Sequence, residues 1–213
     1  MTSKKNFKET GIDISHWNGA IDFTKVKKSG ISFVIIKAGG SDKGFYTDRQ
    51  FENNYRLAKL AGLKVGAYYF VGRGFLSAAD GIADAKRFIN IIRGKDFDYP
   101  VFLDLESTSP EAREGATIAS VAFLEELEAN GYFAGIYASD ISGFKERLII
   151  DSLKPYCKWV ARYSNKKPTY AKDFGIWQYS SRGQIDGIRT NVDLDLSVVD
   201  YAALIRSKNF NRG

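Results

Sequence analysis

The sequence predicts an α/β fold, a single domain whose strands close into a barrel. Eight short runs rich in Val, Ile, Phe and Tyr recur along the 213 residues, each bounded by Gly, Asp, Ser or Pro. Segments long enough to carry helices separate the first five runs, and strands that alternate with helices favour parallel pairing. After Cys157 the strand signals follow one another with little helical sequence between them. The pattern favours a barrel whose last third lacks a helical shell; an open doubly wound sheet is the alternative.

The strand candidates define one continuous unit. No internal repeat, low-complexity tract or Pro- or Gly-rich linker interrupts them, so one domain is expected. In chain order they are residues 11–15, 31–38, 63–71, 99–105, 132–138, 157–163, 174–179 and 191–194.

Two helices are expected between the second and fourth of these strands. Asp48 is placed to cap the first helix, which ends before Gly62. Ser77 and Asp80 form a capping pair that opens the second, which ends before Gly94. Apolar residues three and four apart predict a buried face on each helix. They are Phe51, Tyr55 and Ala58 in the first helix and Ile82, Ala85, Ile89 and Ile92 in the second.

Two further helices are expected later in the chain. Ser109 followed by Pro110 starts the third, and Gly131 lies past its end. A fourth is predicted over residues 142–153, stopped by Pro155. The predicted buried face of the third helix consists of Ile118, Val121, Leu124 and Leu127.

Composition excludes several classes of function. One cysteine, Cys157, rules out an internal disulfide framework and a multi-cysteine metal cluster, and we expect it to be an inert buried thiol. One histidine, His16, removes mechanisms that need two imidazoles. We interpret His16 as a loop residue packed on Trp17; a general-base role is the alternative. The phosphate-binding patterns G-x-G-x-x-G and G-x-x-x-x-G-K-[ST] are missing at the expected places, so nucleotide binding has no support.

Charge and hydropathy argue against two kinds of partner. The net charge is +6, but the lysine runs at residues 25–28 and 166–167 are short and far apart, so no nucleic-acid partner is expected. No stretch approaches the ~18 apolar residues of a membrane span, so membrane insertion is not expected. Residues 1–10 are basic and lack the apolar run of a secretory signal.

Acidic residues stand at the ends of predicted strands, where barrels and open α/β sheets place their chemistry. Asp104 and Glu106 are two residues apart, so strand alternation turns both to one side, with Cα atoms about 6.6 Å apart. Repulsion raises one pKa, so one group keeps its proton near neutrality while the other ionises. Glycoside cleavage uses this division of labour. An acidic pair at a loop edge and a half-built Mg²⁺ or Ca²⁺ site are the alternatives.

Further candidates come from other strand ends. Asp13 and Asp193 lie in comparably apolar strands, and both approach the acidic pair if the first and last strands of the barrel are neighbours. Aromatic rings with polar edges suit the C–H faces and hydroxyls of sugars. Because they stand at strand ends, we assign Tyr68, Tyr137 and Trp177 to the site rather than to the barrel core.

At these same residues the sequence resembles the glycoside hydrolase family 25 muramidases, the lysozymes of the Chalaropsis type. The matching blocks follow the family's order over about residues 9–206, and the ordered set is specific where each block alone is not. The blocks are GIDISHWNG at 11–19, FVIIKA at 33–38, AGLKVGAYYF at 61–70, PVFLDLE at 100–106, GIY at 135–137, WVARY at 159–163, WQY at 177–179 and VDL at 192–194.

The resemblance implies a flattened TIM-like barrel with five β/α units followed by three strands. It also implies cleavage of the β-1,4 bond between N-acetylmuramic acid and N-acetylglucosamine in peptidoglycan. Glu106 takes the acid/base position and is expected to be protonated. Asp104, expected to be charged, assists the substrate's own acetamido group. Asp13 and Asp193 match the other two acidic positions, and Lys37, inside a matching block, joins the substrate-binding candidates.

The resemblance also implies how the chain is organised. A catalytic domain over residues 9–206 is expected between an N-terminal tail, 1–8, and a C-terminal tail or linker start, 207–213. We expect a monomer without cofactor or metal that binds bacterial peptidoglycan strands. Such a chain is the catalytic domain of a phage endolysin or a bacterial autolysin. With no signal peptide, it is expected to be made in the host cytoplasm and released by a holin, or otherwise exported.

The sequence departs from the family pattern at several positions. Tyr69 stands where many members have His, residues 39–41 where many have Thr-Glu-Gly, and Asp195 where many have Asn. These differences affect groove polarity and subsite contacts more than the core chemistry.

Two other classes of function stay open. A non-catalytic glycan-binding barrel would keep the aromatic residues without needing the paired acids. A metal-dependent polysaccharide deacetylase would place Asp13, Asp104 and Asp193 around one cation, although the chain lacks the usual imidazole ligands.

Overall fold

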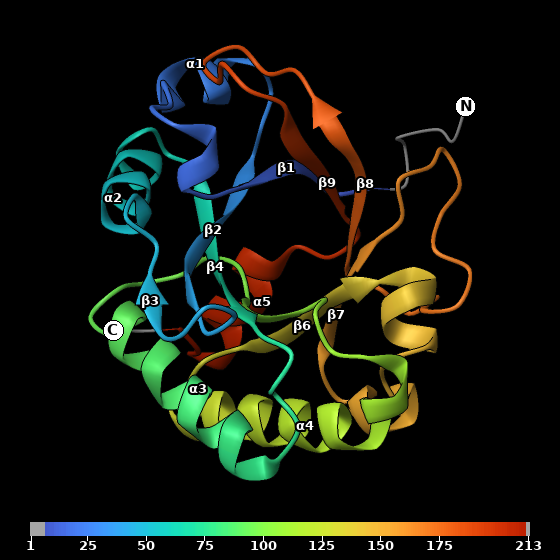
Figure 1. The fold of residues 1–213 in the computed structure, drawn as a ribbon. Helices are drawn as coiled ribbons and strands as arrows, with labels where there is room; N and C mark the ends of the chain where they lie inside the picture. The colour runs from blue at the N-terminus through green and yellow to red at the C-terminus, as the bar shows by residue number, and fades with distance from the viewer. Residues whose placement is uncertain (1–6, 212–213) are drawn as a thin grey trace.

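Eight strands close into a barrel in the computed structural model, which describes residues 7–211 (Figure 1). Neighbours follow the order β1-β9-β8-β7-β6-β5-β4-β2, and pairing of β1 with β2 closes the ring. Only β9 runs antiparallel to both of its neighbours in this ring. The strands are β1 (Glu9–Ile14), β2 (Phe33–Gly40), β4 (Lys64–Val71), β5 (Val101–Leu105), β6 (Ala134–Ser139), β7 (Cys157–Ala161), β8 (Ile176–Gly183) and β9 (Val192–Ser197), with the two-residue β3 (Tyr46–Thr47) added beside β2. The predicted barrel is confirmed, and the open sheet is wrong.

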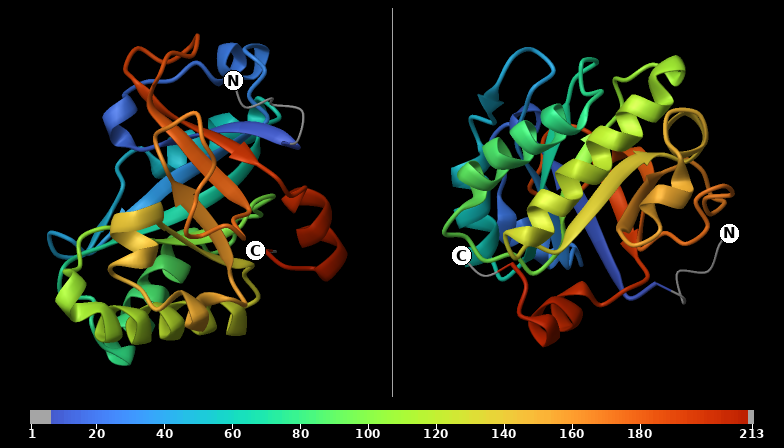
Figure 2. Two further views of the ribbon diagram at one scale, coloured as in Figure 1. Left: turned by 90° about the vertical axis from the view of Figure 1, so that its right-hand side faces the viewer. Right: turned by 90° about the horizontal axis from the view of Figure 1, so that it is seen from below.

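Helices cover only part of the barrel, as predicted. The long helices α3 and α4 pack side by side against one side of it, and the structure has no α-helix between β7 and α5 (Figures 1 and 2). The helices α1 and α5 and the strand β3 were not predicted from the sequence. The helices are α1 (Phe23–Lys28), α2 (Phe51–Leu60), α3 (Ala78–Ile92), α4 (Arg113–Ala129) and α5 (Tyr201–Lys208).

Two predicted helix faces are partly wrong. Ile82 and Ile118 are 37% and 55% exposed, although both were expected inside. The reason is the crossing of α3 over α4. A Cβ on Gly81 would lie 2.2 Å from the Ala119 carbonyl oxygen, so only glycine permits this approach. The crossing centres the buried face of α3 on Gly81 and that of α4 on Ala119, which turns Ile82 and Ile118 to the flanks.

Two other helix predictions also need correction. Asp48 does not cap α2, because the N-cap of that helix is Gln50. The Asp48 carboxylate instead accepts a hydrogen bond from the Gln50 N–H at 2.9 Å and lies 2.6 Å from His16 Nδ1. Residues 142–153 do not form one helix. The structure has a π-turn over Asp140–Lys145 and a 3₁₀ turn over Ile150–Leu153. The Asp140 carboxylate accepts from three backbone N–H groups of residues 169–171, which ties this segment to the loop after β7.

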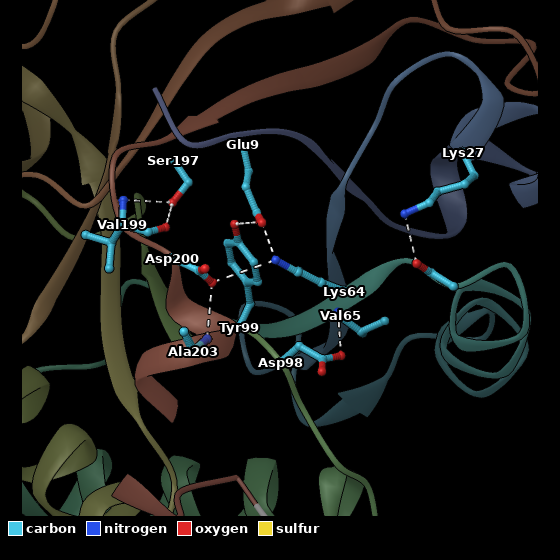
Figure 3. Close-up of polar contacts among 11 residues, drawn as sticks. Glu9, Lys27, Lys64, Val65, Asp98, Tyr99, Ser197, Val199, Asp200 and Ala203 are labelled. Atoms are coloured by element: carbon cyan, nitrogen blue, oxygen red, sulfur yellow. Dashed lines mark hydrogen bonds and ion pairs between the residues drawn. The ribbon is translucent and has the colours of Figure 1, made fainter. Parts of the chain in front are cut away.

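The end of the barrel where the parallel strands begin is closed by a polar cluster (Figure 3). The Tyr99 hydroxyl donates to Glu9 Oε2 at 2.5 Å, and the Lys64 ammonium pairs with the other Glu9 oxygen and, at 3.7 Å, with Asp200. Above this floor the inner core is aromatic, with Phe33 stacked on Tyr99 at 4.2 Å between ring centroids. An open site is therefore expected at the opposite end.

The terminal segments were predicted as tails. Residues 1–6 and 212–213 lie outside the described residues, and the domain bounds stay a prediction. Residues 207–211 belong to the folded body, since Asn211 is buried and its Oδ1 accepts from the Phe133 N–H at 2.7 Å. Among residues 7–211, every helix is too short or too polar to cross a membrane.

Candidate active site

A pocket of about 120 Å³ lies inside the barrel mouth, where the parallel strands end. It contains all four acids singled out from the sequence: Asp13 on β1, Asp104 on β5, Glu106 just beyond β5, and Asp193 on β9. Asp13 and Asp193 are opposite one another in the β1–β9 pairing, so the predicted seam is confirmed. The rest of the lining consists of Tyr68, Tyr137, Trp159, Tyr163 and Gln178.

Asp104 and Glu106 face the pocket together, while Leu105 between them packs in the core outside the barrel. Asp104 is 4% exposed, whereas Glu106 is exposed at the pocket mouth. Burial, followed by the Glu106 charge, raises the pKa of Asp104 well above its usual range. Burial also raises the pKa of Glu106. The hydrogen bond between the two carboxyl groups raises the pKa of Asp104 and lowers that of Glu106. In the free protein the shared proton therefore favours Asp104, opposite to the sequence expectation.

A second carboxyl pair lies next to the first. Burial, then the charges of Asp195 and Asp193, raises the pKa of Asp13 well above its usual range, and burial raises the pKa of Asp195 to about 8. Trp159 Nε1 donates to Asp195 Oδ1 at 2.8 Å. Within the described residues, Asp195 Oδ2 is buried with no N–H or O–H donor, and a hydrogen bond links Asp195 to Asp13. A proton held between the two carboxyl groups satisfies this oxygen.

Gln178 on β8 connects the acids to the tyrosines. Its Nε2 donates to Asp13 Oδ2 at 2.7 Å. Its Oε1 accepts from the hydroxyls of Tyr137 at 2.9 Å and Tyr163 at 3.1 Å. The side chain is 3% exposed, and all the hydrogen bonds run in fixed directions because an amide offers distinct donor and acceptor ends. Gln178 therefore fixes the positions of Asp13 and of two hydroxyls in the pocket.

Lys37 on β2 is the cation whose charge acts on both Asp104 and Glu106. Its ammonium lies 4.5 Å from the centroid of the Phe70 ring and 5.8 Å from that of Tyr68. Its charge lowers the pKa of both Asp104 and Glu106, against the larger effect of burial. Lys37 thus lies at the site, as expected.

Comparison with known proteins agrees with this geometry. The sequence model of the family described as "Glycosyl hydrolases family 25" matches residues 12–188. The chain belongs to that family. It is 32% identical to the "Autolytic lysozyme" of Clostridium acetobutylicum over 185 residues, covering 87% of this chain and 54% of that protein. It is 30% identical to "Lysozyme M1" of Streptomyces globisporus over 201 residues, covering 86% and 65%.

Solved structures give the same result for the family 25 fold. The CTP1L endolysin superposes with a TM-score of 0.80 at 27% identity, covering 94% of this chain and 70% of that one. The bacterial lysozyme of Streptomyces coelicolor superposes with a TM-score of 0.76 at 27% identity, covering 94% and 97%. Family membership confirms the expected barrel and the expectation of a glycoside hydrolase. The chain spans a little over half the length of the clostridial relative.

One residue of this family 25 domain that was predicted to lie in the site, Trp177, does not line the pocket. Trp177 is 2% exposed and its Nε1 donates to the Arg162 carbonyl at 2.9 Å, away from the acids. The alternation of β8 gives the inward position to Gln178 and the outward position to Trp177. No role was predicted from the sequence for Gln178, Trp159 or Tyr163, and Asp195 was singled out only as a departure from the family pattern that affects groove polarity. A polar residue such as Gln178 inside an apolar strand was the available signal.

Two further expectations concern residues outside the pocket. His16 packs on Trp17 with ring centroids 4.5 Å apart, as predicted. Cys157 was expected to be buried, and the residue is partly exposed. Its sulfur lies 2.7 Å from the Tyr201 hydroxyl, and burial of the thiol raises its pKa to about 12, consistent with an inert thiol.

Proposed function

We propose that this family 25 domain is an N-acetylmuramidase, a peptidoglycan hydrolase that cleaves the β-1,4 bond between N-acetylmuramic acid and N-acetylglucosamine. The observation that carries the proposal is the Asp104–Glu106 pair, two hydrogen-bonded carboxyl groups of which one is buried and the other is exposed at the pocket mouth. The names of the clostridial and streptomycete relatives, both lysozymes, support the substrate class.

Glu106 is the general acid in this proposal, because it is the member of the pair that a substrate in the pocket can reach. A bound sugar displaces water from the mouth, which disfavours the charged form of Glu106. The proton then moves across the shared hydrogen bond from Asp104 to Glu106, and from Glu106 to the glycosidic oxygen as that bond breaks.

Asp104 acts once it has given up this proton. As an anion beside the anomeric carbon, it accepts a hydrogen bond from the N–H of the substrate's 2-acetamido group and stabilises positive charge there. The acetamido carbonyl oxygen forms a bond to the anomeric carbon as the leaving oxygen departs. Water later attacks that carbon and gives its proton to Glu106. This route uses the substrate as its own nucleophile, which is a known exception to the two-carboxylate scheme.

The direct test is digestion of purified cell wall, followed by mass spectrometry of the sugar that carries the new reducing end. Reducing-end muramic acid is expected. Glu106→Gln should lower the rate roughly 10²–10⁴-fold, the usual contribution of a general acid. Glu111→Gln, an exposed glutamate outside the pocket, is the matched control and should keep full activity.

Other results would redirect the assignment. A fully active Glu106→Gln variant removes Glu106 from the mechanism, and reducing-end glucosamine or freed peptide identifies a different bond. Binding to wall without new reducing ends favours the glycan-binding barrel, and loss of activity with a chelator favours the deacetylase. The same proposal makes the bacterial cell wall the place of action. Release by a holin and the monomeric state stay predictions.

A further inference from the structure

A second and larger groove, of about 820 Å³, opens at the same end of the barrel as the acid pocket. One wall is the segment between β1 and α1, and the other is the turn between β8 and β9; these segments lie side by side at the top of Figure 1. Trp17 and Lys25 line the first wall, and Asp186, Arg189 and Thr190 line the second. The proposed mechanism uses none of these residues.

Trp17 presents an aromatic ring that is both exposed and held in place. It is 74% exposed, more than the other large apolar side chains of the described residues. Its backbone lies in the 3₁₀ turn His16–Asn18, where the Trp17 N–H donates to Ser15 Oγ at 3.3 Å and the Ser15 N–H to Asn18 Oδ1 at 3.0 Å. The Trp17 ring packs on the ring of His16. The Asp48 carboxylate holds His16 in place through hydrogen bonds with the His16 backbone N–H and with its ring nitrogen Nδ1. An ordered ring loses little entropy on binding a ligand.

The groove and the acid pocket are built from the same two segments of the chain. Trp17 in the groove follows Asp13 of the pocket by four residues, and Thr190 in the groove precedes Asp193 of the pocket by three. Asn18 joins the two walls, since its Nδ2 donates to Thr190 Oγ1 and to the Asn191 carbonyl, each at 3.2 Å. A chain-like ligand that lies over Asp13 and Asp193 extends toward Trp17.

The charges of the groove favour a neutral polar ligand. Lys25 and Arg189 are matched by Asp22 and Asp186, so the lining carries two groups of each sign. A polyanion gains little from such a surface. The polar side chains of the groove offer hydrogen-bond donors and acceptors to the hydroxyl and acetamido groups of a sugar, and the flat C–H face of that sugar can pack on the Trp17 ring.

We propose that this groove is an additional saccharide subsite, in which Trp17 stacks on a sugar of the peptidoglycan strand beyond the pair that is cleaved. The inference rests on the proposed function, because it extends the same strand across the barrel mouth. Its role is to hold long glycan strands on the enzyme rather than to take part in bond cleavage.

The experiment measures binding of the full chain to insoluble purified peptidoglycan by co-sedimentation. All variants carry Glu106→Gln, so that the wall is not digested. Trp17→Ala should weaken binding roughly 5- to 10-fold, whereas Trp17→Phe, which keeps a ring, should lose less. Leu60→Ala is the matched control, because Leu60 is 73% exposed on α2 and outside the groove; its binding should equal that of the parent.

The two proposals fail in distinguishable ways. A parent that binds and a Trp17→Ala variant that binds equally well overturn the subsite and leave the muramidase intact. A parent that does not bind peptidoglycan overturns the subsite, and the digestion test of new reducing ends decides the muramidase separately. Circular dichroism establishes that each variant is folded, and the exposed position of Trp17 makes unfolding of the alanine variant unexpected.

Discussion

Replacing Asp195 with asparagine tests whether the second carboxyl pair holds a proton in the folded protein. The amide has nearly the size of the carboxyl group, so its Oδ1 can accept from Trp159 Nε1, as Asp195 Oδ1 does at 2.8 Å. Its Nδ2 takes the place of Asp195 Oδ2 and donates to Asp13, so that it replaces the proton shared by the two carboxyl groups. The change therefore removes a titrating group without removing a hydrogen bond.

The expected gain in stability depends on pH, and its sign follows from the two pKa values of Asp195. Burial raises its pKa in the folded protein to about 8, against 3.8 for an unperturbed aspartate. Below about pH 4 the group is protonated in both states, and its titration costs nothing. Between about pH 4 and pH 8 Asp195 ionises only in the unfolded chain, so the free energy of unfolding falls by about 1.4 kcal/mol for each pH unit. Asparagine does not ionise, so the variant does not lose this stability. Asp195→Asn should be more stable by about 3 kcal/mol at pH 6 and by up to about 5 kcal/mol at pH 8.

The measurement is the free energy of unfolding in urea, followed by circular dichroism at pH 4.5, 6 and 8. Asp186→Asn, a change of the same chemistry at an exposed carboxylate, is the control and should show a difference that stays small and flat. A stability difference for Asp195→Asn that is constant with pH, or that shrinks as the pH rises, would refute the reasoning, because the proton would then not be held by the folded state.

Two other substitutions test the pocket itself. Gln178→Leu removes the donor to Asp13 and the acceptor of two tyrosine hydroxyls, so activity on cell wall should fall roughly 10- to 100-fold; an unchanged rate would mean that Asp13 needs no positioning. Lys37→Met keeps the apolar stem beside Phe70 and removes the charge that lowers the pKa of the catalytic pair, so the alkaline limb of the pH–rate profile should move to higher pH. A limb that stays in place or moves to lower pH would contradict this.

The parts of the site that follow local rules were predictable from the sequence. Strand alternation alone places Asp104 and Glu106 on one side, and the apolar residues of β5 mark the other side as core. The approach of Asp13 and Asp193 needed one further condition, a closed barrel with the first and last strands paired, and the pattern of strands and helices made that the favoured fold.

The errors arose where a neighbouring element decides the answer. In β8 the alternation holds at Trp177 and Gln178, but which of the two faces inward depends on how β8 pairs with β7 and β9, and the sequence of β8 alone does not show this. Trp177 was assigned to the site because it is an aromatic residue at a predicted strand end. On α3 and α4, the crossing at Gly81 sets which residues are buried, and nothing in either helix alone reveals that contact.

The arrangement of the carboxyl groups explains how one small pocket holds them all. Full ionisation of Asp13, Asp104 and Glu106 in the pocket, and of Asp195 beside it, would face only partial compensation, from Lys37 on Asp104 and Glu106 and from Arg147 on Glu106. Sharing protons within two pairs relieves the repulsion, and the pairs differ in access to solvent. Asp13 and Asp195 are both buried and tied to Gln178 and Trp159, which suits a pair that holds the pocket in shape. Only the other pair has an exposed member, so the proton that can leave the protein toward a substrate is the one shared by Asp104 and Glu106.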